Sequence, residues 1–204
     1  GRIDPYAPDS PARLERWLEE PNMRGIRMSG RWSTLDKQFY EALDDPALEW
    51  YWAACEKLGI PIMILTGKYV SKLARLAQRH PRLVMIIDHL SVQRANTVAE
   101  AFGAYQEVLA VARYPGIHIK VGNGPNASRR PYPFDDVHDY LRGIHQAFGA
   151  RRMLWEADIT QLTKNTYAEC LRLWQEGLPF LSAEDREWIL SGTAAQVLNW
   201  PQSA

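Results

Sequence analysis

Short apolar runs alternate with amphipathic stretches along the whole chain. Nearly continuous apolar runs of this kind are typical of strands buried in a parallel sheet; they occupy 25–28, 61–65, 83–87, 117–121 and 152–155, with a further strand end at Ile3. Helical spacing of apolar residues separates them, over 10–20, 44–58, 70–79, 96–113, 135–148, 167–176 and from 182 onward. Turn and loop residues fill 29–32 and 122–134. The pattern predicts an α/β protein with a parallel sheet covered by helices.

Two architectures fit five or six such units, an open doubly wound sheet and a closed (β/α)8 TIM barrel. The dinucleotide-binding Gly-rich turn of many doubly wound proteins is absent, because Gly122-Asn123-Gly124 is followed by Pro125 rather than by a helix. A barrel needs about 250 residues, whereas this chain has 204. Residue 1 is Gly, and Gly1–Pro5 has the character of a strand end. We therefore expect one domain over 1–204, a barrel that lacks its first two to three βα units.

Charge and cysteine content exclude several classes of partner. The 24 basic and 24 acidic residues balance to a net charge of +0, so no basic excess favours nucleic acid or an anionic membrane. No apolar run approaches the ~20 residues that span a bilayer. Cys55 and Cys170 are far apart and show neither zinc spacing nor a disulfide framework. These features favour a cytoplasmic protein that acts on a small molecule.

Candidate chemistry lies where the predicted strands end, since active sites of parallel α/β proteins form at the carboxyl ends of strands. Arg27, His89, Lys120 and Asp158 occupy such positions. A histidine and an aspartate at the ends of separate strands suit a metal site or an acid–base pair, because imidazole nitrogen and carboxylate oxygen serve both purposes. The residues alone leave these two alternatives open.

Several segments resemble the amidohydrolase-related family of TIM-barrel metal-dependent hydrolases and decarboxylases. The similar segments are Ile86-Ile87-Asp88-His89-Leu90, Tyr132-Pro133-Phe134 with His138, 148–158 and the C-terminal stretch 180–201. Together they cover nearly the whole chain. The resemblance implies that the strands present are the end of the third through the eighth, and that the family's His-x-His pair would precede Gly1.

The resemblance also assigns roles. His89 matches the sixth-strand histidine and Asp158 the eighth-strand aspartate, which bind metal or take the proton from the attacking water. Both are therefore expected as catalytic residues and as metal ligands. A divalent metal, zinc before others, is the expected cofactor of the full-length protein. The strand at 61–65 ends without the family's fifth-strand histidine, which keeps a metal-independent reaction open.

One position departs from the family in an informative way. The final strand usually ends Trp-Gly-Ser/Thr-Asp, whereas here Glu156 takes the place of the glycine in Trp155-Glu156-Ala157-Asp158. Strand residues two apart share a face, so Glu156 should point with Asp158 toward the barrel axis. Two neighbouring carboxylates need a cation between them. We expect a metal or Lys120 to supply it, unless the strand turns Glu156 outward, and we expect glycine at 156 to retain or raise activity.

Four residues are candidates for binding substrate. Arg27 suits a bidentate grip on a carboxylate, with a local ion pair as the alternative. Lys120 is expected to line the pocket. Arg130 lies in the loop 122–134, where barrels often hold anions, although exposed loop arginines are commonplace. His138 begins a helix behind that loop, either as a residue of the helix cap or at the pocket rim.

These observations predict a hydrolase in which water attacks the carbonyl of a small carboxylated lactone, ester or amide. Asp158 would accept the proton of the water, and His89 would orient the water or polarise the carbonyl. Two alternatives stay open: a non-oxidative decarboxylase of the same family, and a non-catalytic barrel remnant used for binding or assembly. Assembly into a homo-oligomer is also compatible with the sequence.

Overall fold

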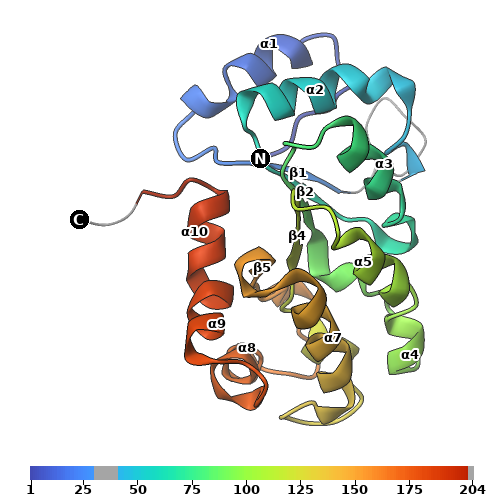
Figure 1. Cartoon of the computed structure of the whole chain (residues 1–204), viewed down its shortest axis with the longest axis vertical. Helices are drawn as coiled ribbons and strands as arrows, with labels where there is room; N and C mark the ends of the chain where they lie inside the picture. The colour runs from blue at the N-terminus through green and yellow to red at the C-terminus, as the bar shows by residue number, and fades with distance from the viewer. Residues whose placement is uncertain (30–40, 202–204) are drawn as a thin grey trace.

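A single parallel sheet organises the chain, as the computed structural model shows for residues 1–29 and 41–201 (Figure 1). Its strands are β1 (Ile26–Met28), β2 (Ile62–Ile64), β3 (Met85–Ile87), β4 (Ile117–Lys120) and β5 (Met153–Leu154). They pair in chain order, β1-β2-β3-β4-β5. A doubly wound sheet would reverse its order at a switch point, so the sequential order confirms the barrel topology.

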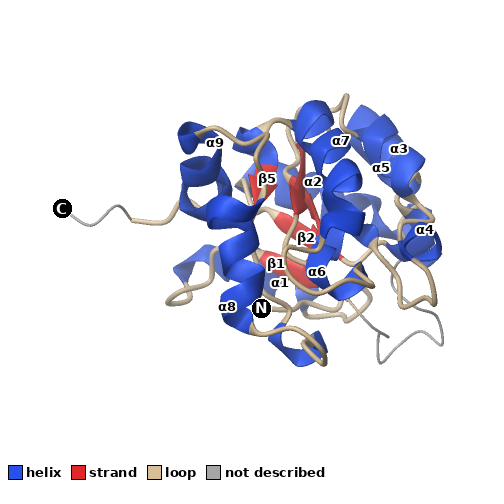
Figure 2. Cartoon of the chain, turned by 90° about the horizontal axis from the view of Figure 1, so that it is seen from below, coloured by secondary structure: helices blue, strands red, loops and turns tan. Residues whose placement is uncertain are grey.

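Helices cover the outside of the sheet, and Figure 2 shows the strands enclosed by them. The helices preceding and following the first three strands are α1 (Ser10–Glu15), α2 (Glu49–Leu58), α3 (Lys72–Arg79), α4 (Val98–Ala101) and α5 (Tyr105–Val111). Those after β4 are α6 (Gly124–Ala127), α7 (His138–Phe148), α8 (Tyr167–Arg172), α9 (Ala183–Glu187) and α10 (Thr193–Val197). None of the described helices is long and apolar enough to cross a membrane.

In β1 and β4 the pleat of the strand separates core from site. Ile26 and Met28 of β1 are fully buried, and Arg27 between them projects from the opposite face of the strand. The alternation repeats in β4, where Ile117 and Ile119 are buried and Lys120 is only partly so. The apolar face packs against the helices, and the other face carries the polar side chains to the carboxyl ends of the strands.

Some predicted elements differ from the observed ones. The helix expected over 96–113 is interrupted between α4 and α5, where Phe102 turns to stack on Tyr140 with ring centroids 4.3 Å apart. The loop 122–134 contains the short helix α6. No strand forms at Ile3, although the Gly1 carbonyl accepts a hydrogen bond from the Arg27 amide at 2.9 Å. The turn predicted at 29–32 lies, apart from Ser29, outside the described residues.

The five described strands do not close on themselves. β1 and β5 are the two outer strands, and the Trp155 amide after β5 donates to the Ile189 carbonyl at 2.7 Å instead of to a neighbouring strand. Five strands are too few to close at ordinary tilt. The described residues thus form an incomplete barrel, as expected.

Candidate active site

A left-handed turn follows β3 and delivers His89 to the carboxyl edge of the sheet. His89, Leu90 and Ser91 have φ values of 54°, 57° and 58°. Such angles are uncommon outside glycine, so surrounding contacts must hold the turn. The Ser91 hydroxyl supplies two of these contacts, lying 2.8 Å from Thr66 Oγ1 and donating to the Gly67 carbonyl at 2.6 Å. The loop after β2 therefore fixes the turn that carries His89.

Asp88 is the buried anion beneath this turn. Its side chain is inaccessible to solvent and accepts from Arg27 Nε at 2.7 Å and from Lys120 Nζ at 3.1 Å. Burial alone would raise the pKa of Asp88, but the charges of Lys120 and Arg27 outweigh it and lower that pKa. Asp88 thus remains a carboxylate and anchors a cation from each of two other strands.

The contacts of His89 determine its tautomer. Nε2 lies 3.0 Å from Arg27 Nη2, and Nδ1 lies 3.0 Å from Glu156 Oε1. A guanidinium can only donate hydrogen bonds, so Nε2 must be the acceptor. Nδ1 then carries the proton and donates it to the Glu156 carboxylate. His89 is a neutral imidazole held between an anion and a cation.

Asp158 completes the cluster. One carboxylate oxygen, Oδ1, accepts from Thr160 Oγ1 at 3.0 Å. The other, Oδ2, lies 3.8 Å from His89 Nε2, beyond the length of a direct hydrogen bond. Asp158 therefore offers one oxygen to a molecule in the pocket.

A pocket of about 670 Å³ opens at this edge of the sheet. Arg27, Arg94, Arg129 and Lys164 line it, and Asp158 is the one carboxylate among its described lining residues. Amides and hydroxyls supply most of the remaining polar lining, and no Phe, Tyr or Trp belongs to the described part of it. Because the whole chain has a net charge of +0, this local excess of cations favours an anionic ligand.

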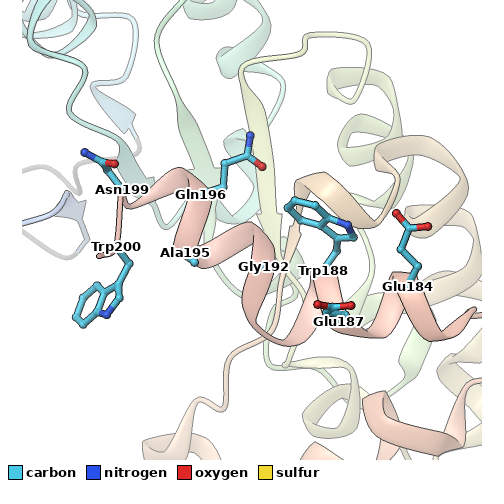
Figure 3. A pocket seen from close by; sticks show the side chains of 8 residues that line it. All are labelled: Glu184, Glu187, Trp188, Gly192, Ala195, Gln196, Asn199 and Trp200. Atoms are coloured by element: carbon cyan, nitrogen blue, oxygen red, sulfur yellow. The ribbon is translucent and has the colours of Figure 1, made fainter. Parts of the chain in front are cut away.

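A second hollow, of about 750 Å³, runs along α9 and α10 on the outside of the molecule (Figure 3). Its lining includes Glu184, Glu187, Trp188 and Trp200. It contains none of the residues that end the strands, and therefore none of the predicted site residues. The pocket at the strand ends is the candidate active site.

The structure brings three of the predicted site residues together and separates three others. Arg27, His89 and Asp158 all line the pocket. Lys120 does not; its ammonium is bound to Asp88 beneath the pocket. Arg130 is exposed and pairs with Asp135 at 2.9 Å, and His138 Nε2 lies 2.8 Å from the Pro133 carbonyl. Lys120, Arg130 and His138 thus lie outside the described lining of this pocket, and their roles in substrate binding stay predictions.

Glu156 does face inward with Asp158, and its side chain is 12% exposed. Its partner is His89 and not Lys120, because Asp88 already occupies the lysine. The sequence offered no sign of this pairing, since it depends on the left-handed turn at His89. Lys164 and Arg94 were not identified as lining residues either, because single polar residues in loops carry no periodic signal, and Arg129 was noted only as a neighbour of Arg130 in the anion-binding loop.

The described residues do not fit a metal ion. Only His89 and Asp158 could bind one at the pocket floor, and no group of three His, Cys, Asp or Glu side chains in 1–29 and 41–201 is arranged to hold one. The Arg27 guanidinium also occupies the Nε2 lone pair. A divalent cation would have to displace that guanidinium and then lie beside its charge.

Fold and site together define an incomplete α/β barrel with a cluster of charged and polar side chains at the carboxyl ends of its strands. The amidohydrolase family model matches residues 2–200, and the chain belongs to that family. L-fucono-1,5-lactonase of Burkholderia ambifaria is 29% identical over 161 residues, which are 78% of this chain and 53% of that enzyme. The chain thus spans about half the length of this curated relative.

Solved structures show the same fold. A Burkholderia multivorans amidohydrolase with bound zinc superposes with a TM-score of 0.77 at 20% identity, over 98% of this chain and 72% of that one. A Pseudomonas putida protein assigned as a 2-pyrone-4,6-dicarboxylic acid hydrolase gives a TM-score of 0.69 at 16% identity, over 99% of this chain and 70% of that one. Family and fold are those of an amidohydrolase-type TIM barrel.

Proposed function

We propose that this chain carries the active site of a lactone hydrolase whose substrate bears a carboxylate. The observation that carries the proposal is the convergence of Arg27, His89 and Asp158 in a pocket lined by four cations. A lactone is also the compound in the name of the curated relative, and 2-pyrone-4,6-dicarboxylic acid, named for one structural neighbour, is a lactone with two carboxylates. The carboxylate is inferred from the charge of the pocket, since the fuconolactone named for the relative carries none.

The geometry supports a different catalytic role for each of the three residues. Asp158 Oδ2 is the free base: it takes a proton from a water whose oxygen bonds to the lactone carbonyl carbon. Arg27 donates to the carbonyl oxygen or to the substrate carboxylate through Nη1 or the second N–H of Nη2, since Asp88 engages Nε and His89 engages one N–H of Nη2. The bond to the ring oxygen then breaks, and that oxygen takes the proton from Asp158 to give a hydroxy acid.

The tautomer of His89 narrows its role. A neutral imidazole whose Nε2 accepts hydrogen bonds cannot donate from that atom to a carbonyl. His89 therefore serves as an acceptor that orients Arg27 or a water, and polarisation of the carbonyl is left to the guanidinium.

Further properties remain part of the proposal. Zinc in the whole protein would need ligands beyond the described His89 and Asp158. A cytoplasmic location agrees with Cys55 and Cys170, which are both buried and unpaired. One barrel domain, a carboxylated small molecule as the substrate and assembly into a homo-oligomer complete the hypothesis.

The test is a panel of neutral and carboxylated lactones, offered to the whole protein in a weakly buffered proton-release assay. Carboxylated lactones should be opened faster, and Asp158→Asn should lower kcat by about 100-fold or more, the usual contribution of a general base. Glu107→Gln, at an exposed position of α5, is the matched control. Release of CO2 from a carboxylated ring without lactonase activity would support the decarboxylase instead, and a whole protein inert to both would support the remnant.

A further inference from the structure

We propose that Glu156 is a positioning residue that holds His89 as the Nδ1–H tautomer and, through it, holds Arg27 in place. The inference concerns the ground-state structure of the site. It rests on the lactonase proposal only in its kinetic test.

The contacts form one continuous chain. Glu156 Oε1 accepts from His89 Nδ1 at 3.0 Å, and His89 Nε2 accepts from Arg27 Nη2 at 3.0 Å. The side chains of His89 and Glu156 are only 11% and 12% exposed, so water competes weakly for these bonds. The orientation of the guanidinium therefore depends on a carboxylate that does not itself contact it.

The backbone places Glu156 with little freedom. A Cβ atom at Gly122 would lie 1.5 Å from the Glu156 carbonyl oxygen, so only glycine allows this close approach of the segments after β4 and β5. The segment after β5 is thereby held against the end of β4, and its carboxylate faces the turn that carries His89. This fit involves only the backbone of residue 156, so it fixes where the side chain of Glu156 begins, and the bond to His89 fixes where it ends.

Loss of the carboxylate would change the donor and acceptor pattern. Without an acceptor at Nδ1, the proton of a neutral imidazole can move to Nε2. Nε2–H would then face the Arg27 N–H groups, placing two donors 3.0 Å apart where there is now a hydrogen bond. Arg27 would keep Asp88 as its one partner among the described residues, and its guanidinium could rotate.

The bond between Glu156 and His89 reverses the expectation formed from the family pattern. Glycine at 156 was expected to retain or raise activity, on the argument that a second carboxylate burdens the site. Because Glu156 is bonded to His89, we now expect Glu156→Gly to lower activity.

The decisive measurement is the tautomer of His89, read from imidazole ¹⁵N chemical shifts of the ¹⁵N-histidine-labelled whole protein. His89→Gln assigns the signals, and thermal unfolding verifies that each variant is folded. In the wild type we expect a pyrrole-like Nδ1 and a pyridine-like Nε2. Glu156→Leu should shift the population toward Nε2–H, and Glu156→Gln, whose amide oxygen can still accept, should shift it less. A pyridine-like Nδ1 in the wild type, or shifts unchanged in Glu156→Leu, would overturn the inference.

Kinetics test the link to Arg27. Glu156→Leu should lower kcat/KM by roughly tenfold or more, the size usual for residues that orient a histidine. If Glu156 acts through Arg27, the effects of Glu156→Leu and Arg27→Lys will not multiply in the double variant. Multiplicative effects would refute this link. A protein that opens no lactone but shows the tautomer shift would refute the proposed reaction and keep the role of Glu156.

Discussion

Arg152 joins the segment before β4 to the end of α7, and its removal gives a stringent test of how these segments are held together. Its guanidinium donates to the Ala112 carbonyl at 2.7 Å and to the Tyr114 carbonyl at 3.1 Å, both in the segment that leads from α5 to β4. It also donates to Phe148 and Ala147 at the end of α7, at 2.9 and 3.1 Å. We predict that Arg152→Met, which keeps the apolar stem and removes every donor, destabilises the protein without altering the chemistry of the site.

The size of the expected loss in unfolding free energy depends on which of these carbonyls can find a new hydrogen-bond donor. The Phe148 and Ala147 carbonyls lie at a helix end, where water can replace the arginine. Those of Ala112 and Tyr114 are contacted from across the fold and lose their charged partner outright. A hydrogen bond to a charged group contributes about 1.5–3 kcal/mol. Two such bonds, less the recovered hydration of the segment, give an expected loss of about 2–4 kcal/mol in the free energy of unfolding.

The assay is urea denaturation at pH 7. The variants can be compared when the unfolding free energy depends equally steeply on urea concentration in each. Arg151→Met is the matched control, because the neighbouring Arg151 is exposed, pairs only with Glu184 at 3.1 Å and lies over the ring of Trp188. Surface contacts of this kind contribute about 1 kcal/mol or less. Equal losses in the two variants would refute the argument that Arg152 binds segments together, as would reduced turnover of Arg152→Met under conditions where it is fully folded.

Two further predictions concern other parts of the molecule. The hydrogen bond from Lys72 at 2.6 Å lowers the pKa of Asp44. Asp44 therefore contributes stability above its unfolded-state pKa of about 3.9, and loses it as pH falls through the lower folded-state value. The gap in unfolding free energy between wild type and Asp44→Asn should be full at pH 7 and should shrink in acid; a constant gap would contradict the assignment. Gly122→Ala should lower both stability and kcat/KM, because its Cβ would meet the Glu156 carbonyl; Gly103→Ala, whose Cβ would lie 3.2 Å from the Glu100 carbonyl, should cost less.

The strands could be predicted from the sequence because most of their residues are apolar and buried, all three of them in β3. Helix ends were harder. The stretch 96–113 keeps helical spacing throughout, yet Phe102 leaves the helix to stack on Tyr140, a residue of α7 that no local pattern connects to it. Local spacing therefore predicts that helix forms, whereas tertiary contacts decide where it is interrupted.

The candidate site was likewise predictable only in part. The meeting of Arg27, His89 and Asp158 follows from parallel topology, which brings the carboxyl ends of all strands to one edge. Which partner each side chain takes depends on torsion angles that the sequence does not reveal. His89-Leu90-Ser91 contains no glycine to signal a left-handed turn, and without that turn the pairing of His89 with Glu156 could not be foreseen. Lys120 was matched to Glu156 on charge alone. Its actual partner is Asp88, which directly follows the neighbouring strand β3 and accepts a hydrogen bond from Lys120 at 3.1 Å.

The adjacency of Asp88 and His89 has a consequence for selectivity. Two consecutive residues grip the same edge of the Arg27 guanidinium, one at Nε and the other at Nη2. The plane of the guanidinium is thereby fixed before any ligand arrives, so little rotational entropy remains to be lost on binding. A flexible cation would adapt to carboxylates or carbonyls at many positions, whereas this one can bind only a group that approaches its remaining N–H groups, on Nη1 and Nη2, within the plane of the guanidinium. The enzyme should therefore discriminate between positional isomers of one lactone, with equal charge and equal hydrophobicity, more sharply than between lactones that differ in size.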